Sequence, residues 1–285
     1  MADPILRVLD KLHLTQRLVF HRRRRVNDRE FIVPLIRGSG HMNLLEHEPW
    51  MIPLLAPLLD MRPGTFVDVG VSVGQSLLRL RSLNADTPYV GCEPNPISLA
   101  YVEELVRVNG LRNVRLLPVA VGDRTGLVEL MSVHDDPADG TATTIAGFRP
   151  GEPAWSRMVP MFPFHALERY MGDGPIGILK VDVEGAEVDV LEGARRRMER
   201  DRPAVLLEIL PVYDPSNTDR LVRQQRIEEL FRALDYTLCR VEAQGRAVDL
   251  VPMNGPIGIH GDVERTNYLA VHRSLEVAGI RARLR

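Results

Sequence analysis

The chain has 285 residues, 45% hydrophobic and 26% charged, which is ordinary for a soluble globular protein and enough for one large α/β domain. Its formal net charge of -2 argues against a broad nucleic-acid surface, which is usually basic. No apolar run approaches the roughly 20 residues of a membrane helix, and the two distant cysteines, Cys92 and Cys239, favour a reduced, cytoplasmic setting.

The first 62 residues are predicted to form a small extension before the main domain, residues 63–285. Apolar spacing predicts an amphipathic helix over residues 4–19. The basic run from Arg22 to Arg25 precedes Asn27-Asp28, a good tight-turn pair, so we expect a solvated hairpin. A site for RNA or an acidic substrate is the alternative for this short, isolated run.

A helix with two internal prolines is predicted before the first strand of the main domain. Residues 51–58 have helical apolar spacing, but Pro53 and Pro57 conflict with it, so a short, kinked or broken helix is expected.

The stretch from Thr65 to Ser76, TFVDVGVSVGQS, predicts a buried strand, a glycine turn and a helix. Gly70 and Gly74 allow a sharp bend and a close ligand. Ser72 breaks the G-x-G-x-x-G pattern of dinucleotide-binding turns. Asp68 repels a pyrophosphate but attracts a cation, which suits the sulfonium and ammonium of S-adenosylmethionine. An ordinary strand-to-helix turn is the alternative.

Glu93 ends the next predicted strand, residues 88–93, and follows the glycine turn by about 20 residues, where an acid can accept hydrogen bonds from two ribose hydroxyls. Asn95-Pro96 predicts the start of a helix, with Asn95 as the N-cap. A third strand is predicted over residues 114–121, ending at Val121.

Residues 132–157 are rich in Gly, Pro, Asp and Thr and predict a long loop. Such a loop is either plain surface or a lid over the substrate. His134 and His165 bracket it, and either is a candidate base, although a lone histidine is more often structural.

The next predicted strands end in acids. A strand is predicted over residues 176–183, with Asp182 near its end, and Glu184 is expected to start a helix. Glu208 lies near the end of the strand over residues 203–210. Because ligands of open parallel sheets bind outside the carboxyl ends of the strands, these acids are expected to gather at one crevice. A helix near residues 227–234 and strands at 236–241 and 267–272 complete the chain.

Three segments together resemble the FkbM family of S-adenosylmethionine-dependent methyltransferases: FVDVGVSVGQS, VGCEPNP and LKVDVEGAEVDVLEGA. The resemblance covers about residues 66–208. It implies a Rossmann-like class I methyltransferase fold, with a seven-stranded, mostly parallel sheet whose last strand is antiparallel. It also implies methyl transfer, most often to a hydroxyl of a sugar or natural product. The family's usual turn is D-V-G-A-N-x-G; here Val71-Ser72 replaces Ala-Asn, so Ser72 or the backbone must supply the lost contact.

The candidate site residues divide by role. For the cofactor S-adenosylmethionine they are Asp68, Gly70, Ser72, Gly74, Glu93, Asn95 and Val121. Asp182 is the first candidate for the base that takes the hydroxyl proton, with Glu184 and His165 behind it. Asp182, Glu184 and Glu208 could together hold Mg²⁺, but no metal is expected.

The expected partner is a hydroxylated small molecule, and no binding to a membrane or to nucleic acid is expected. The sequence does not define the oligomeric state. One alternative function is a methyltransferase that acts on RNA, protein or an amine nitrogen. The other is a non-catalytic binding module of the same fold, for which the altered Val71-Ser72 turn is the only hint.

Overall fold

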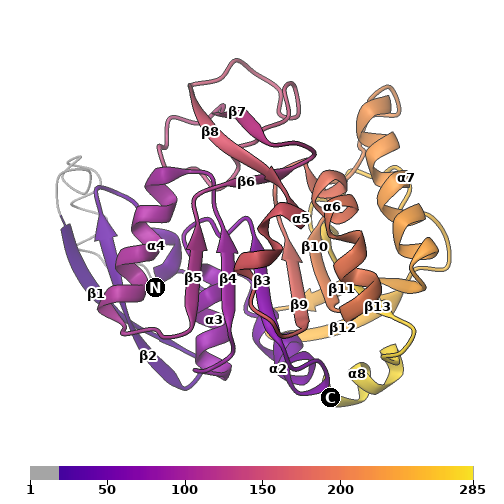
Figure 1. The fold of residues 1–285 in the computed structure, drawn as a ribbon, viewed down its shortest axis with the longest axis horizontal. Coiled ribbons are helices and arrows are strands. Elements are labelled where there is room, and N and C mark those ends of the chain that lie inside the picture. Colours follow the sequence, from indigo (N-terminus) through magenta and orange to yellow (C-terminus); the bar gives the residue numbers. More distant parts are fainter. Residues whose placement is uncertain (1–18, 285) are drawn as a thin grey trace.

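The computed structural model describes residues 19–284, and its centre is an eight-stranded sheet with helices on both faces (Figure 1). From one edge to the other the strands are β12 (Ala247–Pro252), β11 (Tyr236–Gln244), β13 (Asn267–His272), β10 (Ala204–Glu208), β9 (Ile176–Val181), β3 (Thr65–Val69), β4 (Tyr89–Cys92) and β5 (Val114–Leu117). The reversal of order between β3 and β9 is the kind of switch point at which open α/β sheets bind ligands.

The directions of the strands agree with the predicted class. Strands β3, β4, β5, β9 and β10 pair in parallel, whereas β13 lies antiparallel between β10 and β11. The α/β class and the antiparallel last strand are therefore confirmed. The predicted number of seven strands is wrong, because Gly245, with a φ of 61°, turns the chain back and β12 pairs antiparallel with β11 as an eighth strand.

Helices cover both faces of the sheet. Successive apolar side chains along each strand point to opposite faces, so each face needs a layer of helices to form a core. The first face carries α2 (Met51–Met61), α3 (Gln75–Leu83), α4 (Pro96–Val108) and α8 (Val277–Leu284). The second carries α5 (Phe164–Leu167), α6 (Glu187–Asp201) and α7 (Thr218–Ala233). Two 3-10 helices, His41–Leu44 and Glu168–Tyr170, lie in connections. Phe66 packs into the first core and Val67 into the second, as the period of two requires.

The predicted hairpin is confirmed. Strands β1 (Val19–Val26) and β2 (Arg29–Ile36) pair antiparallel, and Asn27 takes the left-handed conformation of the turn with a φ of 51°. Arg23 pairs with Glu30 at 3.0 Å, and Arg24 donates to the carbonyl of Asn43. Part of the basic run therefore holds the hairpin. The helix predicted over residues 4–19 falls outside the described residues, except that Val19 begins β1.

Helix α2 is one continuous helix of 11 residues, so of the short, kinked or broken forms predicted for it the broken one is wrong. Pro53 lies in the first turn, where a backbone N–H has no partner within the helix. Pro57 does remove one helical bond, but Leu54 and Leu58 are fully buried, and their packing offsets the loss. These leucines belong to the same core as β3, so the described part of the predicted extension, residues 19–62, packs as part of the main body.

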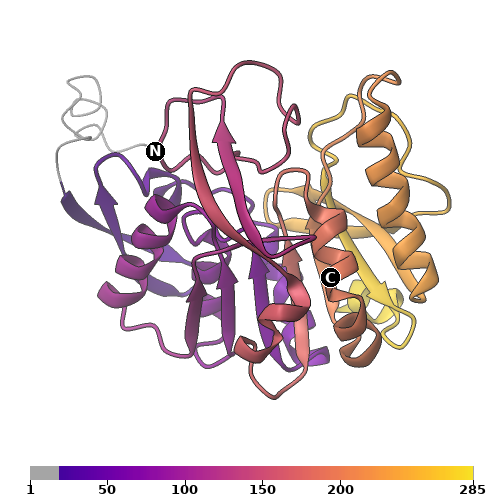
Figure 2. The same ribbon diagram turned by 45° about the horizontal axis from the view of Figure 1, so that its top comes forward.

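A second, three-stranded sheet lies across the carboxyl ends of β3, β4 and β5 (Figure 2). Its strands are β6 (Ala120–Gly122), β8 (Trp155–Pro163) and β7 (Gly126–Ser132), in that order. The single strand predicted over residues 114–121 is therefore wrong: β5 ends at Leu117, Pro118 cannot donate a ladder bond, and the chain re-enters a different sheet as β6.

Both cysteines are free and buried. Among the helices of residues 19–284, none combines the length and the apolar character needed to cross a bilayer.

Candidate active site

The backbone of the turn between β3 and α3 adopts left-handed conformations at three residues. Gly70, Ser72 and Gly74 all have positive φ angles, of 91°, 51° and 78°. Gly70 has no room for a side chain, since a Cβ there would lie 1.8 Å from the carbonyl oxygen of Asp182. The turn after β3 is thus packed directly against the end of β9.

Glu93, directly after β4, braces this turn. Its Oε2 accepts from the Ser72 N–H at 2.7 Å, and its Oε1 accepts from the Asn95 N–H at 2.8 Å. Burial raises the pKa of Glu93 to about 7, although these two N–H groups act in the opposite direction. Each carboxylate oxygen has a further lone pair, so the group can accept from ligand hydroxyls as well.

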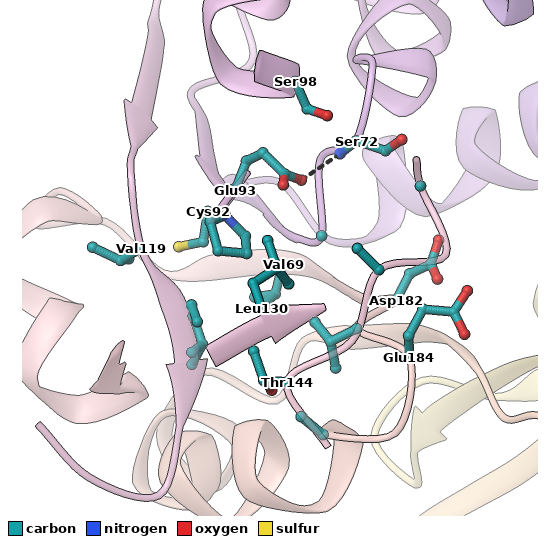
Figure 3. A pocket seen from close by; sticks show the side chains of 18 of the residues that line it. Val69, Ser72, Cys92, Glu93, Ser98, Val119, Leu130, Thr144, Asp182 and Glu184 are labelled. Carbon is teal, nitrogen blue, oxygen red and sulfur yellow. Dashed lines mark hydrogen bonds between the residues drawn. The ribbon is translucent and has the colours of Figure 1, made fainter. Parts of the chain in front are cut away.

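A cavity that is partly open to solvent lies between the two sheets (Figure 3). Its lining comes from the ends of β3, β4 and β9, from β6 and β7, and from the loop after β7. The lining residues are Val69, Gly70, Ser72, Cys92, Glu93, Pro94, Ser98, Val119, Ala120, Val121, Leu130, Asp139, Gly140, Ala142, Thr144, Asp182, Val183, Glu184 and Ala186. Its place at the switch point between β3 and β9 makes this cavity the candidate ligand site.

The structure brings six of the predicted site residues to this cavity: Gly70, Ser72, Glu93, Val121, Asp182 and Glu184. Glu93 points toward Ser72 at one end, and the carboxylates of Asp182 and Glu184 point together at the other (Figure 3). Apolar side chains such as Val69 and Leu130 lie between these ends and suit a flat, weakly polar group. An acceptor carboxylate at one end and an apolar wall beside it therefore fit an adenosine-type ligand.

Asp68 does not line the cavity, so the direct cofactor contact predicted for it is corrected. Its side chain is fully buried, with Oδ1 3.2 Å from the Lys180 ammonium and Oδ2 accepting from the Tyr89 hydroxyl at 2.7 Å. Burial raises its pKa, and Lys180 opposes that shift. Sequence reasoning missed Lys180 because it could not see that β3 and β9 pair with Asp68 opposite Lys180.

Three other predicted residues also lie outside the lining. Gly74 is the N-cap of α3. Asn95 caps α4 as predicted, accepting from the Ile97 N–H at 3.1 Å, and its amide donates to the carbonyl of Pro137 in the loop over the cavity. His165 is exposed on α5 and does not line the cavity, so its prediction as a candidate base is corrected.

Ligand atoms of Asp182, Glu184 and Glu208 lie within 4.8 Å of one another. The expectation that Glu184 belongs to a helix is wrong: its φ is 54°, and α6 begins only at Glu187. Burial raises the pKa of Glu184 to about 8, and burial and then Asp182 raise that of Glu208 to about 7. Two of the acids already have cationic partners, Arg149 at 2.6 Å from Glu184 and Lys180 at 3.2 Å from Asp182.

The loop after β7 closes over the cavity. The Thr143 hydroxyl donates to the carbonyl of Glu184 at 2.6 Å, and Arg149 donates to its carboxylate. Phe148 covers Gly185, where a Cβ would lie 2.6 Å from its ring. The predicted loop thus contributes Asp139 and Thr144 to the lining, residues that no sequence signal singled out.

A family model described as the Methyltransferase FkbM domain matches residues 68–238. No curated protein matches the chain. Among solved structures, the FkbM methyltransferase of Methylobacillus flagellatus KT is 17% identical with a TM-score of 0.46; the match covers 73% of this chain but only 43% of that protein.

Two further solved structures are similar at the same level. An O-methyltransferase from Bacillus cereus, in complex with SAH, is 14% identical with a TM-score of 0.47, over 82% of this chain and 86% of its own. An rRNA methylase from Streptococcus thermophilus is 12% identical with a TM-score of 0.41, over 77% of this chain and 91% of its own. At this similarity neither defines the acceptor of the present chain.

Proposed function

The chain belongs to the FkbM methyltransferase family, and on that premise we propose that it transfers a methyl group from S-adenosylmethionine to a hydroxyl of a sugar or natural-product small molecule, in the cytoplasm. The observation that carries this proposal is the continuous cavity that joins Glu93 at one end to Asp182 at the other. One end has the acceptor groups for a nucleoside, and the other has a carboxylate for proton removal.

The residues proposed to hold the donor are those of the glycine turn and the end of β4. Glu93 accepts hydrogen bonds from the ribose hydroxyls, and Gly70 and Ser72 allow the backbone to approach the ligand. Val121 forms part of the apolar wall. When bound, S-adenosylmethionine supplies an electrophilic methyl group, whose C–S bond breaks as the bond to the acceptor oxygen forms, leaving S-adenosylhomocysteine.

Asp182 is the proposed base that takes the proton from the acceptor hydroxyl. Its side chain is 37% exposed, so a substrate can reach it, and its Oδ2 accepts from the Lys180 ammonium at 3.2 Å. Glu184 is only 8% exposed and is paired with Arg149, and Glu208 does not line the cavity, so an acceptor reaches Asp182 more readily than either of them. Holding donor and acceptor in line supplies much of the acceleration.

We propose that the reaction needs no metal ion. A divalent cation prefers carboxylate oxygens, and Asp182, Glu184 and Glu208 are close enough to share one. Arg149 and Lys180 already supply positive charge to two of them, so a cation would compete with both.

The proposed function is tested by calorimetry with S-adenosylmethionine and by mass spectrometry of products. Purified protein is incubated with the donor and a panel of sugars and hydroxylated metabolites, with amines and total RNA as separate arms. Methylation of a hydroxyl is the expected result. Methylation only of RNA or of an amine would replace the proposed acceptor, and failure to bind the donor would favour a non-catalytic module.

A further inference from the structure

The chain has 36 basic residues, and only two of them, Lys11 and Lys180, are lysines. Lys180 lies in β9, with its side chain only 8% exposed. The two cations differ in shape: a guanidinium spreads five N–H groups over a planar fork, whereas an ammonium directs three from one nitrogen. Within residues 19–284, where every other Lys or Arg position is arginine, the compact ammonium is thus found at this buried position.

The Lys180 ammonium lies close to three oxygens. It donates to the carbonyl oxygen of Gly70 at 3.1 Å and to Asp182 Oδ2 at 3.2 Å, and it forms an ion pair with Asp68 Oδ1 at 3.2 Å. The register explains how they meet. Asp68 is directly opposite Lys180 across the β3–β9 pair, and residues 70 and 182 lie two positions further along the two chains, on the same face.

These contacts join the two ends of the cavity. Gly70 belongs to the turn whose Ser72 N–H is held by Glu93, on the proposed donor side. Asp182 is on the proposed acceptor side. The Asp182 N–H also donates to the carbonyl of Val69 at 2.9 Å, so the backbones of β3 and β9 are already joined at this point. Lys180 is the side chain that fixes both the turn and the carboxylate.

The charges around Lys180 keep it cationic. Burial acts to lower its pKa, but the carboxylates of Asp182 and Asp68 outweigh burial, and the net pKa is raised. Asp68, which does not line the cavity, then has a clear use: its carboxylate forms an ion pair with the ammonium, whose two hydrogen bonds go to Gly70 and Asp182.

Resting on the proposed function, we propose that Lys180 is a positioning residue of methyl transfer, which sets the donor-binding turn and the Asp182 carboxylate in one fixed geometry. The site requires the compact shape of an ammonium and not positive charge alone. Arginine at this position keeps the charge, but its longer, planar guanidinium cannot place one nitrogen close to all three oxygens, so it does not replace lysine.

The test measures binding of S-adenosylhomocysteine by calorimetry and stability by urea unfolding, for the wild type, Lys180→Met and Lys180→Arg. The matched control is Arg197→Met. Arg197 is another buried cation, paired with Asp201 at 2.9 Å in α6, and it does not line the cavity. We expect affinity to fall about tenfold or more in Lys180→Met and about fivefold in Lys180→Arg, whereas the control loses stability but keeps its affinity within about twofold.

With an acceptor identified by the product screen, Lys180→Arg should also raise the KM for the donor and lower kcat, because both ends of the site are displaced. A purely structural role would lower the urea midpoint while the folded protein binds as well as the wild type, and that result would overturn the inference alone. Wild-type affinity in Lys180→Arg would do the same, and this variant decides the matter if Lys180→Met does not fold. A wild-type protein that binds no S-adenosylhomocysteine would overturn the proposed function and this inference with it.

Discussion

The carboxylate of Glu93 accepts a 2.7 Å hydrogen bond from the backbone N–H of Ser72, so the acid after β4 holds the turn that follows β3. Ser72 has a φ of 51°, a conformation that costs free energy for a residue other than glycine. The bond helps to keep that conformation, which presents the turn to the cavity.

We expect Glu93→Ala to weaken binding of S-adenosylhomocysteine by about tenfold or more. The substitution removes the proposed acceptor of two ligand hydroxyls and leaves the N–H groups of Ser72 and Asn95 without this partner, at a cost on the order of 1–3 kcal/mol each. Calorimetry measures the change. Glu103→Ala, at an exposed position of α4, is the control and should bind normally. Equal affinities in the two variants would remove Glu93 from the binding site.

The loop over residues 133–154 should open more readily when Arg149 is replaced. Arg149→Met removes the contact with Glu184, so backbone amides near Thr143 should exchange faster by hydrogen-exchange mass spectrometry. In the wild type, S-adenosylhomocysteine should slow the same amides, because Asp139 lines the cavity. Arg124→Met, which removes an exposed pair with Asp123, should change neither. If neither the variant nor the ligand changed the exchange rate of these amides, the segment would be an ordinary surface loop with no role as a lid.

The pH dependence of stability should be governed in part by Glu187. Burial raises the pKa of Glu187 to about 7, while N–H bonds, including one from Gly185, oppose the shift. A carboxyl with a raised pKa holds its proton more strongly in the folded state, so its contribution is complete below pH 4.5 and is lost as pH rises through about 7.

Glu187→Gln should therefore flatten the decline in the free energy of unfolding between about pH 5 and 7, by up to about 1 kcal/mol per pH unit. Urea titrations at several pH values measure the slope. The same substitution at Glu199, exposed on the same helix, should leave the slope unchanged. An identical slope in Glu187→Gln would mean that other groups carry the pH dependence.

Local signals in the sequence were sufficient for the elements that lead to the site. The apolar run before Gly70 predicted β3, Asn95-Pro96 predicted the start of α4, and Asn27-Asp28 predicted the hairpin. Each depends on residues adjacent in the chain, where strand, cap and turn preferences act. The placement of Glu93 at a strand end follows from the same local pattern.

What the sequence could not predict depends on pairing between distant segments. Lys180 meets Asp68 only because β9 lies next to β3, so the charge of Asp68 was assigned to the cofactor instead. The first three residues of β8 fell within the loop predicted over residues 132–157, and the rest of the strand was not predicted; it belongs to a small sheet outside the main ladder. Glu184 was predicted to start a helix. Gly185 instead has a φ of 108°, α6 begins only at Glu187, and the Glu184 carboxylate lies close to that of Asp182.

Replacement of Asp182 by asparagine should abolish methyl transfer while leaving affinity for S-adenosylhomocysteine within about threefold. Asparagine keeps an oxygen that accepts from Lys180, so the turn at Gly70 stays in place. It cannot take a proton from the acceptor, and general-base catalysis contributes on the order of 10²–10⁴ to the rate. Radiolabelled methyl transfer and calorimetry on the same preparation measure the two properties.

The metal alternative predicts a different result from the same assay. If Asp182, Glu184 and Glu208 hold a divalent cation, exhaustive chelation should stop turnover by the wild type, and Mg²⁺ or Mn²⁺ should restore it. If Asp182 acts alone as the base, chelated enzyme should keep its full rate. Chelation-resistant turnover together with an inactive Asp182→Asn variant that still binds the product assigns the proton to Asp182, because the acceptor hydroxyl then has no Lewis acid to lower its pKa.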